Sequence, residues 1–343
     1  MNTGAGTASS VRDGGEVSAP LGFSLMPLEN RRDVLVRLAM EAERAGHGAF
    51  YLPETWAHDT TVLLGEVAAR TSRIELGTGV LGVWNRSAAT IAMAASTLDA
   101  ISGGRFALGL GASTAQLVEG LHDVPYTAPV DRMRRVLTQV RALLKGERVP
   151  LAPGAAARAL RLNLPPAPRV PIHLAGLSPE TVRLAGELAD GWIPFLYPRS
   201  RLHEGAALLR EGRARAATPA EPPRILPSIP TVIAADGAEA RKGAAWFVAF
   251  YLTSMGPFYP RTISRLGFAR EVQAVAAANT TRGSAVVPPE AEVLLEELTV
   301  YGTPDEARAR LARWRQAGAE LPILLLPPQL EPAQIDFTLS ALS

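Results

Sequence analysis

Short apolar runs that alternate with amphipathic helical stretches constrain the fold of this chain more than any other feature. The runs are apolar without a polar alternation, which is typical of strands covered on both faces. They are residues 21–25, 49–53, 74–80, 106–111, 171–175, 191–196, 226–234 and 322–327. Strands separated by helices predict βαβ units and a parallel sheet. Eight such units predict an α/β fold of the (β/α)8, or TIM, barrel type in place of an open doubly wound sheet.

The length of 343 residues suits one barrel domain. We expect residues 1–20, which are rich in Gly, Ser, Ala and Thr, to form a disordered tail, and residues 21–343 to form a single barrel domain. Two segments, 146–170 and 236–300, interrupt the alternation of strands and helices. Insertions in barrel enzymes usually follow strands at the C-terminal mouth, so we expect these segments to build its walls.

Composition excludes several classes of function. The chain has no cysteine, which removes disulfides, thiolate metal sites and a cysteine nucleophile. Its net charge is only +2, and no basic run interleaved with aromatic residues marks a nucleic-acid groove. No apolar stretch suits a signal peptide or a membrane span, so we expect a cytoplasmic protein that binds neither nucleic acid nor membrane. No spacing of histidines and carboxylates predicts a metal site.

Helix starts carry recognisable signals. Asn30 and Asp59 precede helical stretches and are candidate N-caps. Thr303 and Pro304 open a helix predicted over 304–317, with acidic residues near its positive dipole end.

A glycine pattern, Gly77-Thr78-Gly79-Val80-Leu81-Gly82, follows the third apolar run. A dinucleotide-binding loop needs a helix that starts inside the pattern and an acid at the end of the next strand. Here residues 83–86 intervene before the helix, and the next strand ends in Gly109-Leu110-Gly111. The pattern therefore favours a strand end where the backbone approaches a flat ligand, since glycine permits close approach. Tight packing of a helix on the strand is the alternative.

A second glycine segment, Gly176-Leu177-Ser178-Pro179-Glu180-Thr181, opens a helix predicted over 179–189. Free backbone N–H groups at the positive end of a helix dipole make a ready phosphate site. Ordinary N-capping by Ser178 is the alternative.

Glu54, Trp56 and His58 follow the second apolar run, on the side of a barrel that carries catalytic residues. An acid, an indole and an imidazole can together stack on a ring, orient a substrate and relay a proton. These three residues are the catalytic candidates. The alternative is that Trp56 only packs and Asp59 only caps a helix.

Several ordered segments resemble the luciferase-like monooxygenase superfamily, and within it the deazaflavin (coenzyme F420)-dependent oxidoreductases. The segments that carry the resemblance are Tyr51-Leu52-Pro53-Glu54-Thr55-Trp56, residues 71–80, residues 98–106, residues 118–126, residues 184–192, and Gly302-Thr303-Pro304 with Leu324-Leu325-Leu326-Pro327. The resemblance spans about residues 20–330. It implies a TIM barrel with its cofactor at the C-terminal mouth, and hydride transfer between that cofactor and a small organic substrate. It also implies a homodimer.

The resemblance implies a role for particular residues. Gly79-Val80 would support the cofactor ring from behind, often through a non-prolyl cis peptide. Glu54, Trp56 and His58 would face the reacting edge of the ring, with His58 or Glu54 as proton donor. The implied cofactor-binding residues are Thr78, Gly79, Val80, Gly111, Ala112, Ser113, Ala175, Gly176, Leu177, Ser178 and Pro179.

Two departures from the family pattern bear on the cofactor. Members often have Gly-Pro-Lys at the phosphate loop, where this chain has Ser178-Pro179-Glu180. The usual Trp-His pair after the fourth strand is Leu121-His122 here. Three functions therefore stay open: a coenzyme F420-dependent oxidoreductase, a monooxygenase that uses reduced FMN, and a ligand-binding barrel without catalysis.

The sequence does not specify the substrate. Aromatic residues in the 236–300 segment could form an apolar substrate wall, or could be core or a dimer interface. They are Trp246, Phe247, Phe250, Tyr251, Phe258 and Tyr259.

Overall fold

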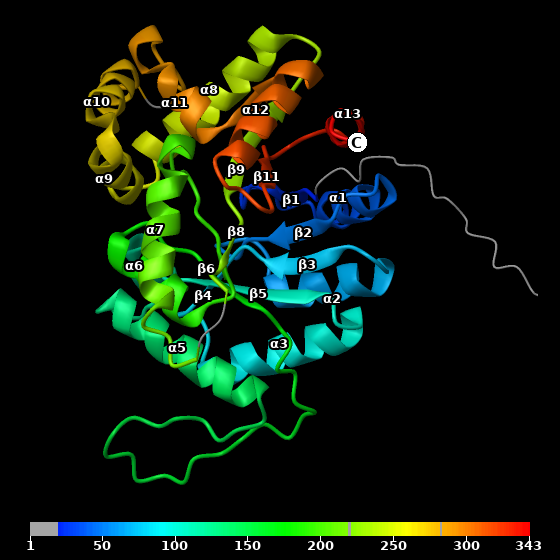
Figure 1. Ribbon diagram of the computed structural model, residues 1–343. Helices are drawn as coiled ribbons and strands as arrows, with labels where there is room; N and C mark the ends of the chain where they lie inside the picture. Colours follow the sequence, from blue (N-terminus) through cyan, green and yellow to red (C-terminus); the bar gives the residue numbers. More distant parts are fainter. Residues whose placement is uncertain (1–19, 219–220, 282) are drawn as a thin grey trace, which may run out of the picture.

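The computed structural model describes residues 20–218, 221–281 and 283–343, and it is an α/β fold built on a parallel sheet (Figure 1). The tail expected over residues 1–20 lies outside the described residues except for Pro20. Every strand pairing in the described residues is parallel, as βαβ units require.

The strands are β1 (Gly22–Leu25), β2 (Ala49–Leu52), β3 (Glu75–Thr78), β4 (Leu81–Gly82), β5 (Phe106–Gly111), β6 (Ile172–Leu174), β7 (Gly191–Trp192), β8 (Arg224–Ile225), β9 (Ser228–Ile233), β10 (Val300–Gly302) and β11 (Ile323–Leu326). The α-helices are α1 (Arg32–Arg44), α2 (Thr60–Arg70), α3 (Ala88–Ser102), α4 (Ala115–His122), α5 (Pro129–Leu144), α6 (Pro179–Leu188), α7 (Leu202–Arg213), α8 (Gly237–Thr253), α9 (Phe258–Ile263), α10 (Ala269–Ala278), α11 (Val293–Leu298), α12 (Pro304–Gln316) and α13 (Pro332–Ser340).

Each of the eight apolar runs contains a strand of the sheet. The short strands β4, β8 and β10, which have two or three residues each, were not predicted from the sequence. A strand of two or three residues is too short to show a hydrophobic period, so the sequence alone does not reveal it. It becomes recognisable only from its pairing with a neighbouring strand. Strand β10 begins at the last residue of the segment 236–300. It pairs with the C-terminal half of β9.

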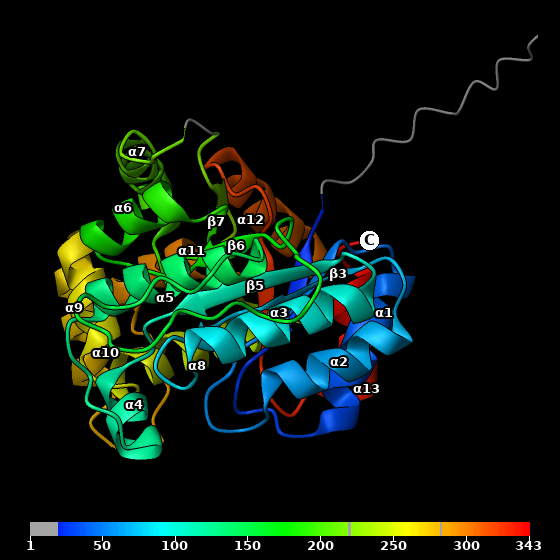
Figure 2. The ribbon, with the colours of Figure 1, turned by 90° about the horizontal axis from the view of Figure 1, so that it is seen from below.

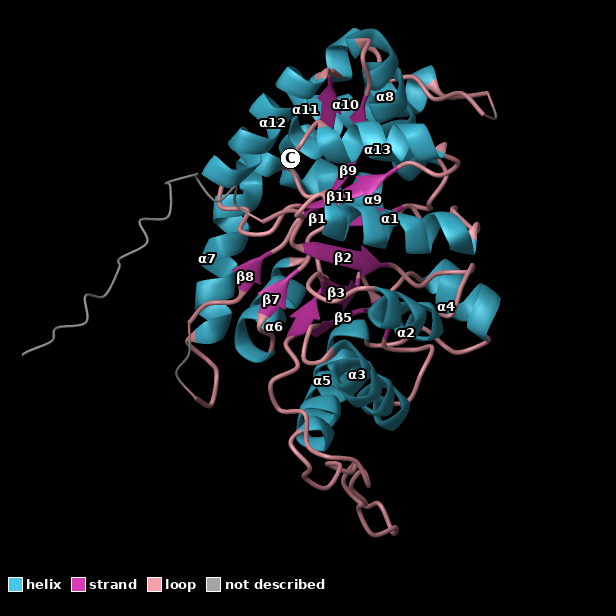
Figure 3. Cartoon of the chain, turned by 90° about the vertical axis from the view of Figure 1, so that its right-hand side faces the viewer, coloured by secondary structure: helices cyan, strands magenta, loops and turns pink. Residues whose placement is uncertain are grey.

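Neighbouring strands follow the order β10-β9-β11-β1-β2-β3-β5-β6-β7-β8, with β4 paired to β5. Figure 3 shows β11, β1, β2, β3 and β5 one above another. Strands β8 and β9 are separated by only Leu226 and Pro227. Across this segment Leu226 N–H donates to Trp192 O of β7 at 2.8 Å, and Ile323 N–H of β11 donates to Pro227 O at 2.8 Å. One short segment therefore bonds to strands near both ends of the order.

Helices cover the outer face of the sheet and bury most of the core against it. Figure 2 shows α1, α2, α3 and α5 running alongside the strands. Residues whose side chains fill the space between the sheet and these helices include Phe50, Leu64, Ile91 and Val140, all fully buried. A smaller cluster that includes Tyr51, Ala107, Ile193 and Ile323 packs on the other side of the strands. Alternate residues of β2 thus serve two cores, as strand geometry dictates.

The two segments that interrupt the alternation differ in structure. Residues 146–170 contain no helix or strand and form the long loop below α5 in Figure 1. Residues 236–300 form α8 to α11, which gather at one end of the molecule around a separate apolar cluster that includes Phe247, Val248 and Leu294. This cluster also includes Met26, Leu196 and Leu325 at or near strand ends, so the second segment packs against the sheet.

Two of the predicted N-caps are confirmed and one is wrong. The Asp59 carboxylate accepts from the N–H groups of Thr61 and Val62, and Thr303 forms a capping box with Glu306. Asn30 does not cap α1, because the N-cap residue is Arg31 and no side chain caps it.

Candidate active site

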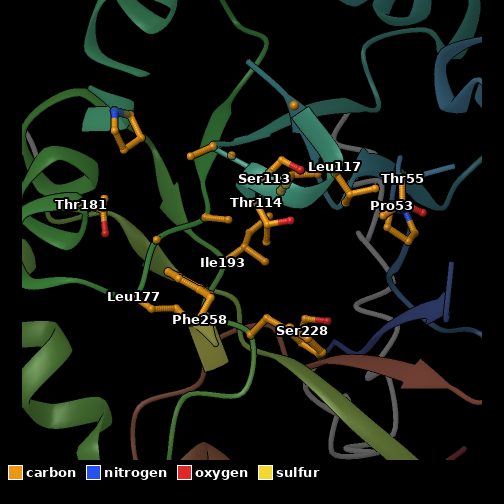
Figure 4. Close-up of a pocket in the computed structure, with 18 of the residues that line it drawn as sticks. Pro53, Thr55, Ser113, Thr114, Leu117, Leu177, Thr181, Ile193, Ser228 and Phe258 are labelled. Atoms are coloured by element: carbon orange, nitrogen blue, oxygen red, sulfur yellow. The ribbon is translucent and has the colours of Figure 1, made fainter. Parts of the chain in front are cut away.

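A cavity of about 430 Å³ opens at the carboxyl ends of the strands (Figure 4). It is lined by residues that follow β2, β3, β5 and β6, which are Pro53, Glu54, Thr55, Gly79, Val80, Gly111, Ala112, Ser113, Ala175, Gly176 and Leu177. Figure 4 places Pro53 and Thr55 at one end of the cavity and Leu177 and Thr181 at the other. The carboxyl ends of parallel strands are where α/β folds bind ligands.

Glycine backbone forms much of the cavity floor. The peptide bond Gly79–Val80 is cis, in agreement with what the resemblance implied. A Cβ atom on Gly111 would lie 2.8 Å from Val80 Cγ2, and one on Gly109 would lie 2.0 Å from the Thr78 carbonyl oxygen. Both distances are shorter than a real contact, so the strands approach each other here only because side chains are absent.

Thr78 acts between strands and does not line the cavity. Its buried hydroxyl donates to Gly109 O and accepts from Gly109 N–H, both at 2.8 Å. These two hydrogen bonds tie β3 to β5 directly beneath the glycine floor. The contact with the cofactor expected for Thr78 stays a prediction, and what the structure shows for its side chain is this contact with Gly109.

The loop before α6 presents unpaired backbone donors to the cavity. Ser178 Oγ accepts from Thr181 N–H and the Thr181 hydroxyl accepts from Ser178 N–H, a capping box that closes the first turn. Among the described residues, the N–H groups of Gly176, Leu177 and Glu180 donate to no protein acceptor. Pro179 opens the helix and does not line the cavity. The arrangement suits an anion at the positive end of the helix.

Glu54 lines the cavity and is held by a partly buried ion pair. Its carboxylate accepts from Arg86 Nη2 at 2.8 Å, from Arg86 Nε at 3.3 Å and from Thr60 N–H at 3.2 Å. Arg86 also lies 2.8 Å from Asp59. Hydrogen bonds from Arg86 to Glu54 and Asp59 raise the pKa of the guanidinium above its usual range. Asp59 holds the Arg86 guanidinium, and the guanidinium in turn fixes the orientation of the Glu54 carboxylate.

Trp56 and His58 lie outside the residues that line this cavity. The Trp56 side chain is 43% exposed, and His58 Nε2 lies 3.1 Å from the carbonyl oxygen of Asn30. The chain turns away from the cavity after Thr55, and a loop gives no periodicity from which this direction could be predicted. Thr55 itself lines the cavity, and its buried hydroxyl has no hydrogen-bond partner in the described residues.

The opposite wall comes from the 236–300 segment and is aromatic. Tyr251, Met255, Phe258 and Tyr259 line the cavity, together with Phe195 after β7. Phe247 is fully buried in the separate helical core, while Trp246 and Phe250 stack on each other with centroids 5.3 Å apart. Tyr251, Phe258 and Tyr259 therefore form a cavity wall, as one interpretation of the sequence has it. Phe247 is a core residue, as the other has it.

The cavity is poor in charge. Glu54 and Glu180 are its charged side chains, and no Arg, Lys or His of the described residues lines it. Nor does any group of three or more His, Asp or Glu in the described residues suit a metal ion.

Below the floor lies a buried polar cluster. The Tyr51 hydroxyl donates to Glu75 Oε1 at 2.7 Å and lies 3.2 Å from His173 Nδ1. Burial lowers the pKa of His173 from 6.5 to about 4, so the imidazole is neutral near neutral pH. The sequence indicated a core histidine at this position, and the side chain is indeed 1% exposed.

Arg86 and the roles of Tyr251 and Tyr259 were not found from the sequence. Arg86 lies 32 residues from Glu54, so the pairing follows from tertiary structure alone. The available signal was an arginine after the glycine-rich end of β3, together with two acids, Glu54 and Asp59, after the end of β2.

A parallel sheet with a glycine-floored cavity at its carboxyl edge defines an α/β protein whose cavity suits a flat or anionic ligand. Comparison with known families narrows this class. The family model of luciferase-like monooxygenases matches residues 7–321, and the chain belongs to this family.

Named relatives match most of the chain. A protein of Mycobacterium tuberculosis that is named as a coenzyme F420-dependent oxidoreductase is 31% identical to this chain. The match covers 84% of this chain and 89% of the relative. The 5,10-methylenetetrahydromethanopterin reductase of Methanolobus tindarius is 24% identical over 81% of this chain and 85% of its own length.

Solved structures share the fold. The coenzyme F420-dependent tetrahydromethanopterin reductase of Methanopyrus kandleri superposes with a TM-score of 0.76 and 19% identity, over 94% of this chain and 97% of that one. The oxygenating constituent of the 3,6-diketocamphane monooxygenase of Pseudomonas putida, in complex with FMN, gives a TM-score of 0.71 and 18% identity, over 95% of this chain and 97% of that one. Within the described residues, no helix has the length and apolarity needed to cross a membrane.

Proposed function

We propose that this protein is a coenzyme F420-dependent oxidoreductase that moves a hydride between the deazaflavin and a small organic substrate. The observation that carries the proposal is the glycine-floored cavity at the carboxyl edge of the sheet, with unpaired amide donors at one end. Relatives that match most of the chain are named as F420-dependent enzymes or as a reductase, and this favours a catalyst over a non-catalytic binding barrel.

The residues present fit a flat cofactor with a phosphate. Gly79, Val80 and Gly111 would lie behind the ring, because all three line the cavity floor and the missing side chain of Gly111 lets Val80 pack against it. Ala112, Ser113 and Ala175 would line its sides. The phosphate would accept from the free N–H groups of Gly176, Leu177 and Glu180, with Ser178 closing the turn beneath it. Thr78 and Pro179 would shape this site without touching the cofactor.

The deazaflavin, when bound, supplies the carbon that gives or takes the hydride. The protein would orient the reactants and keep water out through its largely apolar lining. Arg86 and Asp59 would hold the Glu54 carboxylate in one orientation at the cavity wall, and the free Thr55 hydroxyl would offer a hydrogen bond there. Catalytic roles for Trp56 and His58 stay predictions, and the contacts of both side chains give them no support.

A monooxygenase that uses reduced FMN is the second candidate. Two observations favour it: an FMN complex is among the structures with this fold, and Glu180 replaces the lysine often found at the phosphate loop. An acid beside the phosphate weakens binding of the more anionic of two cofactors.

The sheet is, in this proposal, a closed (β/α)8 barrel formed by one domain, with residues 236–300 at its mouth. The mouth position expected for residues 146–170 has no support, because they join α5 to the start of β6 and none of them lines the cavity. The segment from β8 to β9, which bonds to both β7 and β11, supports closure. The lining contributed by α8 and α9 supports a place at the mouth for residues 236–300. A homodimer and a cytoplasmic location stay predictions from the sequence.

Equilibrium binding of the purified protein to F420 and to FMN, compared in one fluorescence assay, tests this function. We expect saturable binding of F420 that is tighter than binding of FMN. Tight binding of FMN without affinity for F420 would establish the second candidate. Binding of neither would leave a barrel that holds some other ligand.

A further inference from the structure

We propose that the hydroxyl groups of Tyr251 and Tyr259 bind the polar oxygen of an uncharged and otherwise apolar substrate, such as a ketone or a secondary alcohol. This inference deepens the proposed function, because it concerns the substrate side of the same cavity. It rests on three independent features of the wall: the packing of its rings, its free hydroxyls and its lack of cations.

Ring packing fixes the two tyrosines in place. Tyr251 lies near the end of α8 and Tyr259 lies in α9, with their ring centroids 5.2 Å apart and nearly perpendicular. Both rings also pack edge-on against Phe195, at 4.8 Å and 5.6 Å. Such mutual edge-to-face packing restricts the rotation of each ring, so the hydroxyls are held without needing hydrogen bonds of their own.

Both hydroxyls are free of protein partners. Tyr251 is only 4% exposed, yet neither its hydroxyl nor that of Tyr259 has a hydrogen-bond partner in the described residues. Tyr51 and Tyr301, by contrast, donate to carboxylates, and Tyr126 donates to a carbonyl oxygen. A hydroxyl that has no protein partner in an apolar wall can donate to a ligand oxygen without first breaking a protein hydrogen bond.

The two hydroxyls stay protonated under ordinary conditions. Burial raises the pKa of Tyr251 well above its ordinary value, and the nearby Tyr259 raises it further. Burial likewise raises the pKa of Tyr259. The pair therefore presents O–H donors, which select an acceptor such as a carbonyl oxygen.

The rest of the wall selects against charge. Met255, Phe258, Ile193 and Leu325 add apolar surface to the lining of the same cavity. The charged lining residues in the described chain are both acids, Glu54 and Glu180, and no cation is present to pair with an anionic substrate. Beside Tyr251 and Tyr259, a carboxylate or a phosphate ester would lose its hydration without gaining a counterion. Sugar phosphates and fatty acids are therefore poor candidates for the substrate.

Calorimetric titration of the full-length protein without cofactor, with 2-octanone and octanoate as probes, tests the proposal. The buffer contains inorganic phosphate, so that the free amide donors of α6 are occupied and octanoate is compared only at the tyrosine wall. The probes have equal chain length and differ in the charge of the polar end. We expect measurable binding of 2-octanone and at least about 10-fold weaker binding of octanoate. The probe titration contains no cofactor, so its outcome does not depend on whether F420 binds. Failure of F420 to bind in the separate cofactor titration would overturn the proposed function but not the binding of 2-octanone.

The variants Y251F and Y259F separate hydrogen bonding from shape. Each is expected to weaken binding of 2-octanone by about 3- to 10-fold, the effect of one lost hydrogen bond. The matched control is Y197F, since Tyr197 is 4% exposed, packs edge-on against Trp192 and does not line the cavity. It is expected to leave the affinity unchanged. Thermal unfolding shows whether each variant is folded.

Three results would overturn the proposal: no binding of 2-octanone, octanoate binding at least as tightly, or an effect of Y251F and Y259F no larger than that of Y197F. If a single variant does not fold, the other variant of the pair decides the question by the same criterion.

Discussion

Single glycines decide how closely the strand ends of this protein approach each other. The Thr78 carbonyl oxygen occupies the place that a side chain on residue 109 would need, and the Thr78 hydroxyl bonds to both backbone groups of Gly109. The floor of the cavity therefore depends on backbone contact between β3 and β5. A methyl group at this point must push the strands apart.

We predict that G109A lowers the free energy of unfolding by about 1–3 kcal/mol or more, as overpacking of a close contact does. Denaturant unfolding measures it. G65A is the control: Gly65 lies within helix α2, and a methyl group on its Cα would have no neighbouring atom within 4 Å, so alanine there should stabilise by about 0.5–1 kcal/mol. Equal stability of G109A and the parent protein would contradict this account of the floor.

At the scale of elements, the first turn of helix α6 places free amide donors at the end of β6, an arrangement that suits an anion. Its N-terminal turn is closed by the Ser178–Thr181 capping box, which leaves other amide donors free. Glu180 lies in the same turn and lines the cavity, where it repels an anion. The element therefore combines a favourable dipole with an unfavourable side chain.

We predict that E180Q tightens binding of F420 by about 2- to 10-fold at low salt, with a smaller gain at high salt, since screening weakens the repulsion. Fluorescence titration at two ionic strengths measures both. The control is E239Q, which removes an acid from the first turn of α8 on an exposed surface away from the cavity. An equal gain in affinity in both variants would show that only the net charge of the protein matters. No gain in E180Q would show that the cofactor phosphate does not bind at this turn.

At the scale of the whole molecule, the buried core beside the sheet carries an acid-sensitive group. Burial holds the pKa of His173 at about 4, below its ordinary value of 6.5. Between these two values the unfolded chain binds a proton that the folded protein does not bind. The free energy of unfolding therefore falls as the pH falls through this range.

We predict that this effect costs about 2 kcal/mol of stability between neutral pH and about pH 5, from the conversion of pKa shift into free energy. Urea unfolding of the parent and of H173Q at both pH values measures it. The variant should lose less stability on acidification, although it is less stable overall. Burial also lowers the pKa of His47, but that residue is present in both proteins and cancels in the difference. An identical pH dependence would contradict the assignment.

The sequence was informative where local pattern decides structure. Apolar runs located the eight main strands, and capping signals located Asp59, Ser178 and Thr303. The pairing of Glu54 with Arg86 and the direction of Trp56 and His58 depend on how distant segments meet, which local pattern does not record. The helical spacing of Tyr251 and Phe247 is the same for a cavity wall as for a core, so only packing separates them.

The central claim is that the carboxyl edge of the sheet holds the cofactor. Ala175 follows β6 and lines the cavity, so A175F would fill the space assigned to the ring. Titration with F420 is expected to show saturable binding by the parent protein, a loss of at least about 100-fold in A175F, and no change in A156F, whose site is exposed in the 146–170 loop. Binding of F420 by a folded A175F variant as tightly as by the parent protein would contradict the claim.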